Sequence, residues 1–173
     1  MLELGVFRRR RLHCAVSDEL FPAGPWTGFY NYSPKDKHRM DLDLTFQALK
    51  EHGVANPIVA CRDGEEALQY MEEHHLPTDS QIPILVLLDL RLPKVDGIEV
   101  LRQARNDSVW KQVPIVVLTT SRENKDIEAA YQLGVSSYIV KPVDFLAFAE
   151  VVKTIKVYWL LTNEPPFREN NAV

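Results

Sequence analysis

The chain has 173 residues, 46% hydrophobic and 25% charged, which is typical of a globular protein with enough apolar material for a sizeable core. Its net charge of −4 gives no general basic field for nucleic acid, and no apolar run approaches the roughly 18 residues of a membrane-spanning helix. The two cysteines, Cys14 and Cys61, are too few for a disulfide framework. We therefore expect a cytoplasmic protein that binds neither nucleic acid nor membrane.

The first 35 residues differ in character from the rest of the chain. They contain Pro22, Pro25 and Pro34 and show no sustained hydrophobic period. Four arginines at positions 8–11 are best interpreted as a solvated tail. We expect residues 1–35 to form an atypical, partly irregular N-terminal segment.

From about residue 40 onward, segments with helical spacing alternate with strand-like segments. Residues 42–49 predict a helix that Gly53 ends, and the apolar runs 82–89 and 113–119 predict buried strands. Shorter strands are expected at 57–61 and 137–140, and further helices at 67–71, 98–105, 127–131 and 145–159. This alternation predicts right-handed crossovers and a parallel sheet with the two apolar runs at its centre. One more strand is required before the first helix, and its sequence is not obvious.

Polar side chains stand at the ends of three of these strands: Asp89, Thr119 and Lys141. Because ligands of open α/β sheets bind at the carboxyl ends of the strands, we expect these three side chains to meet at one edge. The set suits phosphoryl transfer onto a carboxylate. Asp89 is the predicted nucleophile, and Lys141 and the Thr119 hydroxyl would stabilise charge on the phosphoryl oxygens. The peptide bond between Lys141 and Pro142 is a candidate for the cis form, which would aim the lysine.

Three motifs, "LLDLRLPKVDGIEV", "PIVVLTTSRENKDI" and "GVSSYIVKPV", closely resemble the receiver domain of two-component response regulators. The resemblance covers about residues 36–160 and leaves residues 161–173 as a C-terminal tail. It implies a flavodoxin-like, doubly wound α/β fold. In that fold a five-stranded parallel sheet of order 2-1-3-4-5 carries helices on both faces.

The resemblance also implies roles for individual residues. Asp89 corresponds to the phosphoacceptor, Thr119 to the switch hydroxyl, Tyr138 to the switch aromatic residue and Lys141 to the invariant lysine. The implied cofactor is Mg²⁺, with three implied ligands: Asp36, Asp89 and the backbone carbonyl of Arg91. The implied partner is a sensor histidine kinase.

The C-terminal stretch "VKTIKVYWLLTNEPP" narrows the resemblance. It is similar to the end of single-domain regulators that work with bacterial and cyanobacterial phytochrome kinases. Those regulators have no DNA-binding output domain and tend to dimerise through the face of the last strand and helix. We therefore expect a homodimer through this face. Trp159, in phase with Val152 and Ile155, is expected in the core, and Tyr158, out of phase, on the surface or in a dimer contact.

The match is incomplete where a receiver carries its first strand and two adjacent acids. The acid pair should fall at Asp36 and Lys37, so a lysine replaces the second acid, and the strand 31–34 is a poor candidate because it holds Pro34. Three interpretations stay open. The chain is a pseudo-receiver in which Lys37 partly replaces the cation; or residues 12–16 supply the strand, followed by a long insertion; or the N-terminal stretch is not the natural one.

Two functional hypotheses follow. The first is a response regulator that accepts a phosphoryl group on Asp89 and signals by conformational change and dimerisation. It is no enzyme beyond self-catalysed phosphoryl transfer and dephosphorylation. The alternative is a pseudo-receiver that acts as a phosphorylation-independent interaction module. A flavin carrier of the same fold is disfavoured because no phosphate-binding glycine loop follows a strand.

Overall fold

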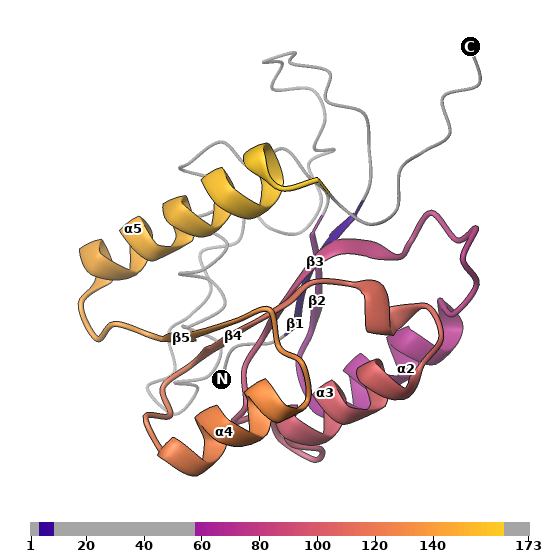
Figure 1. Ribbon diagram of the computed structural model, residues 1–173, viewed down its shortest axis with the longest axis horizontal. Coiled ribbons are helices and arrows are strands. Elements are labelled where there is room, and N and C mark those ends of the chain that lie inside the picture. The colour runs from indigo at the N-terminus through magenta and orange to yellow at the C-terminus, as the bar shows by residue number, and fades with distance from the viewer. Residues whose placement is uncertain (1–3, 9–57, 165–173) are drawn as a thin grey trace, which may run out of the picture.

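The computed structural model describes residues 4–8 and 58–164 (Figure 1). Five strands and four helices alternate in these parts, with a 3-10 turn at Trp110–Gln112 and a π-helical segment at Lys156–Thr162. The strands are β1 (Leu4–Arg8), β2 (Ile58–Cys61), β3 (Pro83–Leu88), β4 (Ile115–Thr119) and β5 (Ser137–Val140). The helices are α2 (Gly64–Glu73), α3 (Gly97–Asn106), α4 (Asn124–Gln132) and α5 (Phe145–Ile155). The helix expected at 42–49 lies outside the described residues.

The strands form one sheet of order β2-β1-β3-β4-β5, as the sequence predicted. β3, β4 and β5 are parallel neighbours. β1 is antiparallel to both β2 and β3, so these two flanking strands share one direction. The prediction of a wholly parallel sheet is therefore wrong for β1. An antiparallel strand can fill this position because its ladder is at least as stable per residue as a parallel one.

The identity of the first strand also differs from prediction. Residues 31–34 and 12–16, the two segments considered for it, lie outside the described residues. Leu4–Arg8 occupies the position between β2 and β3, where Gly5 pairs with Leu87 and Arg8 with Pro83. The atypical N-terminal segment thus contributes a central strand to the sheet, and the domain boundaries near residues 35 and 160 stay predictions.

Helices cover both faces of the sheet: α2, α3 and α4 lie on one side and α5 on the other (Figure 1). The position of β3 explains why every residue of this strand is apolar. Leu85 and Leu87 pack in a cluster with α5, whereas Val86 and Leu88 pack in the larger cluster on the opposite face. A strand buried on both faces needs apolar residues at every position. The predicted central place of this run is confirmed, and none of the four leucine and valine side chains is more than 3% exposed.

Aspartates set the start of three helices. The carboxylates of Asp63, Asp96 and Asp144 accept hydrogen bonds from the backbone N–H three residues later, at the starts of α2, α3 and α5. Each bond satisfies one of the amides that a first helical turn leaves without an intrahelical partner. The loops that follow β2 and β3, and the loop after β5, therefore end at defined positions.

The last predicted helix, 145–159, is found as α5 and the π-helical segment that continues it. Trp159 is half-buried against the α5 cluster, as expected from its phase. Tyr158 is 54% exposed, which confirms its predicted surface position. Within the described ranges, no helix combines the length and the apolar character needed to cross a bilayer.

Candidate functional site

Asp89, Thr119 and Lys141 meet at the carboxyl ends of β3, β4 and β5, as the sequence predicted. Lys141 Nζ lies 2.6 Å from Asp89 Oδ2, and the two side chains are 6% and 3% exposed. The Thr119 hydroxyl also helps to lower the pKa of the Asp89 carboxyl. Parallel pairing produces this meeting, because Thr119 lies beside Val140 in the ladder and Lys141 follows directly. The result is a buried acid in contact with a buried ammonium, with a buried hydroxyl at the end of the strand between theirs.

The ladder itself aims Lys141. Its backbone N–H donates to the Thr119 carbonyl oxygen at 2.8 Å, which extends the β4–β5 pairing by one bond. No peptide bond in the described residues is cis, so the bond between Lys141 and Pro142 is trans and the expectation of a cis bond is wrong. The hydrogen bond to the Thr119 carbonyl oxygen fixes the backbone of Lys141, and no cis peptide bond is needed for this.

The Asp89 carboxylate is held in its charged form. Burial is the largest single influence and opposes ionisation, but the Lys141 ammonium, the Arg91 N–H and the Thr119 hydroxyl together outweigh it. The pKa of Asp89 is therefore lowered from its ordinary value. The Arg91 N–H donates to Oδ1 at 3.0 Å, while Lys141 contacts Oδ2. At neutral pH the group is an anion, which is the form a nucleophile needs.

Gly97 sets the backbone behind Asp89. Its N–H donates to the Leu90 carbonyl oxygen at 3.0 Å. A Cβ at this position would lie 2.1 Å from the Asp89 carbonyl oxygen and 2.7 Å from Leu90 Cα, and both neighbours are backbone atoms that cannot rotate away. The start of α3 thus approaches the phosphoacceptor candidate closely only because residue 97 lacks a side chain.

We expect Gly97→Ala to destabilise the fold by about 3 kcal/mol through overpacking. Gly134→Ala is the matched control, because Gly134 has φ +78 but its nearest contact would be at 3.7 Å. There the left-handed backbone alone costs about 1 kcal/mol. Urea unfolding of both variants measures the difference. Equal losses would contradict the close approach of Gly97 to Asp89.

Tyr138 lies behind the Thr119 loop. Its hydroxyl donates to the Ser121 carbonyl oxygen at 3.2 Å, and burial raises the pKa of the phenol. The Ser121 N–H in turn donates to Thr119 Oγ1 at 3.4 Å. The predicted switch pair, Thr119 and Tyr138, is therefore connected through one intervening residue. Their role as a switch stays a prediction.

The Arg91 side chain turns toward α4. Its Nη2 lies 3.0 Å from Asp126 Oδ2 and 3.3 Å from Ser121 Oγ. The sequence had singled out neither Ser121 nor Asp126. Both look ordinary in the sequence, since a serine in a turn and an acid in the first turn of a helix are each favoured for local reasons.

A second group of charges joins the loop after β3 to the start of α2. Lys94 has φ 61, and its Nζ lies 2.8 Å from Asp63 Oδ2 and 2.8 Å from Glu65 Oε2. The bond from Lys94 lowers the pKa of Asp63, and both acids raise the pKa of Lys94. Lys94 and Glu65 are well exposed, so these pairs contribute little stability.

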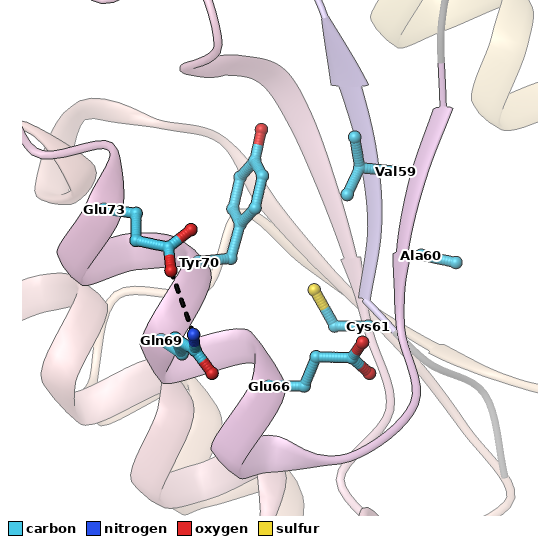
Figure 2. A pocket seen from close by; sticks show the side chains of 7 residues that line it. All are labelled: Val59, Ala60, Cys61, Glu66, Gln69, Tyr70 and Glu73. Atoms are coloured by element: carbon cyan, nitrogen blue, oxygen red, sulfur yellow. Dashed lines mark hydrogen bonds between the residues drawn. The ribbon is translucent and has the colours of Figure 1, made fainter.

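A cavity of about 230 Å³ lies between β2 and α2, and Figure 2 shows the side chains that line it. Its lining comes from these two elements alone: Val59, Ala60, Cys61, Glu66, Gln69, Tyr70 and Glu73. Both glutamates already accept hydrogen bonds, Glu66 from the Arg62 N–H and Glu73 from Gln69. The cavity shares no residue with the strand-end site.

The described residues fit a magnesium ion only in part. Mg²⁺ prefers oxygen ligands, and Asp89 and the Arg91 carbonyl are of this type. The parts of the chain described here hold no group of three or more His, Cys, Asp or Glu side chains able to bind a metal. Asp36 and Lys37 lie outside them. Moreover, β1 ends at Arg8, which pairs with Pro83 at the start of β3, so the carboxyl end of β1 lies at the edge of the sheet opposite Asp89.

Comparisons with known proteins agree with this geometry. The response regulator receiver domain family matches residues 36–153. The probable methanogenesis regulatory protein FilR2 of Methanothrix harundinacea is 43% identical over 71% of this chain and 79% of its own length. The response regulator Rcp1 of Synechocystis is 35% identical over 72% of this chain and 84% of its own.

Solved structures give the same picture. The phosphorylated cyanobacterial phytochrome response regulator RcpA has a TM-score of 0.69 and 38% identity, over 75% of this chain and 92% of RcpA. The Mn²⁺-bound form of Rcp1 has a TM-score of 0.66 and 34% identity, over 72% of this chain and 90% of Rcp1.

Proposed function

Because this chain belongs to the response regulator receiver domain family, we propose that Asp89 is the residue that accepts the phosphoryl group. The observation that carries the proposal is the buried contact of 2.6 Å between Lys141 Nζ and Asp89 Oδ2, at the strand ends beside Thr119. The chain is a two-component response regulator of the receiver type, a signalling domain rather than a classical enzyme.

The chemistry is a transfer onto the carboxylate. One Asp89 oxygen forms a bond to phosphorus, and the bond from phosphorus to the donor breaks, with its electron pair leaving on the donor. Lys141 and the Thr119 hydroxyl then stabilise the negative charge that spreads over the three phosphoryl oxygens in the transition state. Since the Asp89 side chain is only 3% exposed, the groups that cover it must move to admit the donor.

Mg²⁺ is the proposed cofactor, since magnesium use belongs to this family and Rcp1 has an Mn²⁺-bound form. Asp89, the Arg91 carbonyl and Asp36 are the proposed ligands. The ion would neutralise charge between the carboxylate and the incoming phosphoryl group. A pseudo-receiver that works without phosphorylation is the second candidate. It is favoured by the single carboxylate among the described strand-end residues and by the antiparallel β1.

Beryllofluoride, a phosphoryl analogue, separates the two candidates. With Mg²⁺ present, we expect it to change the tryptophan fluorescence of the wild-type protein and to leave Asp89→Asn unchanged, because the analogue must bond to the carboxylate. Fluoride with Mg²⁺ alone is the control. An identical spectrum for wild type with and without beryllofluoride would favour the pseudo-receiver.

A sensor histidine kinase, phytochrome-linked as for RcpA, is the proposed partner, and a homodimer is the proposed assembly. The end of α5 and the π-helical segment supply the support for a dimer face. Val157, Tyr158 and Leu161 are 49%, 54% and 58% exposed there. Large exposed apolar groups that lie together are typical of protein contacts. Sedimentation in the beryllofluoride experiment reports the assembly. The cytoplasmic location stays a prediction.

A further inference from the structure

Ser121 links the candidate phosphorylation site to α4. The side chain is buried, and three of its polar groups are engaged. Its N–H donates to Thr119 Oγ1, its carbonyl oxygen accepts from the Tyr138 hydroxyl, and its own hydroxyl donates to Asp126 Oδ2 at 2.5 Å. Any movement of the Thr119 loop must therefore be accommodated at Asp126.

One carboxylate oxygen of Asp126 accepts hydrogen bonds from two side chains. Oδ2 accepts from Ser121 at 2.5 Å and from Arg91 Nη2 at 3.0 Å. It lies in the first turn of α4, where the helix N-terminus stabilises a negative charge. Asp126 is 17% exposed, whereas Arg91 is 58% exposed, so the arginine is the more solvent-accessible partner of this pair.

These contacts close into a ring that passes through Asp89. Arg91 donates its backbone N–H to Asp89 Oδ1 and its guanidinium to Asp126. The return path runs by hydrogen bonds from Asp126 through Ser121 to Thr119, whose hydroxyl helps to lower the pKa of the Asp89 carboxyl. The guanidinium thus belongs to a residue whose backbone already touches the phosphoacceptor, and only its side chain is held at a distance.

We infer that Asp126 is a positioning residue that restrains phosphate uptake by keeping the Arg91 guanidinium on α4. This inference rests on the proposed role of Asp89. A released guanidinium can donate two parallel hydrogen bonds to a phosphate, the geometry for which arginine is suited. It would then attract a dianionic donor and stabilise charge on the phosphoryl oxygens.

Asp126→Asn tests the inference, because the amide keeps the size and one acceptor but removes the charge that holds Arg91. With acetyl phosphate as donor, an Asp89 oxygen bonds to phosphorus and acetate leaves with the electron pair of the broken P–O bond. We expect the second-order rate constant of this uptake to rise by about three- to tenfold, mainly through a lower apparent KM for acetyl phosphate.

The dependence on Arg91 distinguishes positioning from a structural effect. In an Arg91→Ala background, Asp126→Asn should give no increase. Glu128→Gln removes an equal charge from an exposed position of the same helix and should leave the rate unchanged. Ser121→Ala keeps the ion pair between Arg91 and Asp126 and should not reproduce the gain, and thermal unfolding verifies that each variant is folded.

The outcomes separate this inference from the proposed function. If neither the wild type nor any variant takes up phosphate, the proposed role of Asp89 as phosphoacceptor is wrong, and the inference about Asp126 is lost with it. If wild type is labelled but Asp126→Asn is equally fast or slower, the positioning role of Asp126 is overturned. A gain that persists without Arg91 would also overturn it, because the effect would then be one of charge alone.

Discussion

Asp89→Asn is expected to reduce phosphate uptake from acetyl phosphate to background. The substitution keeps the shape of the side chain but replaces a carboxylate by an amide, whose lone pairs are far less nucleophilic. The amide oxygen of the variant would still be able to accept the Arg91 N–H, which in wild type donates to Oδ1 at 3.0 Å. The loss therefore tests the nucleophile itself and not the shape of the loop.

A Phos-tag gel with acetyl phosphate and Mg²⁺ measures the phosphorylated fraction of wild type and variant. Glu128→Gln is the control for a lost negative charge, since Glu128 is exposed on α4 and outside the strand-end site. The variant must be assayed below its melting temperature, because Asp89→Asn also leaves the buried Lys141 without its anion. Label retained by folded Asp89→Asn would show that another residue accepts the phosphoryl group.

The strand-end site could be predicted because its causes are local and repeated. Apolar runs without alternation identify β3 and β4 as buried parallel strands, and parallel strands bring their carboxyl ends to one edge. Parallel pairing then brings Asp89, Thr119 and Lys141 together, and the conformation of the loops does not change this. The structure confirms the meeting and the order of the strands.

β1 could not be predicted in the same way. Leu4–Arg8 is five residues long, contains Gly5 and runs into arginines, so its local pattern is weak. Its place depends on pairing with β2 and β3, which lie far from it in the sequence. The direction of a strand in such a gap depends on pairing and not on local composition.

The ring through Ser121 and Asp126 was missed for a different reason. Each residue has a sufficient local explanation, as a turn residue and as a first-turn acid of α4. Only the distances of 2.5 Å and 3.0 Å at one carboxylate oxygen show that the two residues act on Arg91 together. Contacts between two loops, 30 to 35 residues apart in the chain, leave no spacing for a sequence pattern to detect.

Lys141→Met is expected to destabilise the fold by about 3 to 5 kcal/mol, since it leaves a buried carboxylate without its counter-charge. The side chains of Asp89 and Lys141 are 3% and 6% exposed, so solvent cannot compensate for the loss. Phosphate uptake should fall as well, on the order of 100-fold, the usual effect of removing one charge-stabilising donor. The double variant Asp89→Asn with Lys141→Met should regain most of the stability, because no charge is then buried.

The pH dependence gives the sharper test, because wild type and Lys141→Met should respond with opposite signs. In wild type the pKa of Asp89 is lowered, so the unfolded chain binds more protons, and the stabilisation is lost as the pH falls through about 4 and below. In Lys141→Met, the ammonium that opposes burial is gone, and we expect burial, the largest single influence on this carboxyl, to raise its pKa above the unfolded value. The folded state then binds the extra proton, and the variant loses stability as the pH rises from about 4 toward neutrality.

Urea unfolding between about pH 3 and pH 8 measures both slopes, with Asp89→Asn and the double variant as references in which this carboxyl cannot titrate. The stability difference between wild type and Lys141→Met should widen with rising pH, whereas the difference between the two references should contain no contribution from this carboxyl. A difference that stays constant over this range would mean that Lys141 stabilises the fold by packing alone. In that case the ammonium would not be what keeps Asp89 charged, and the electrostatic basis of its reactivity would be lost with it.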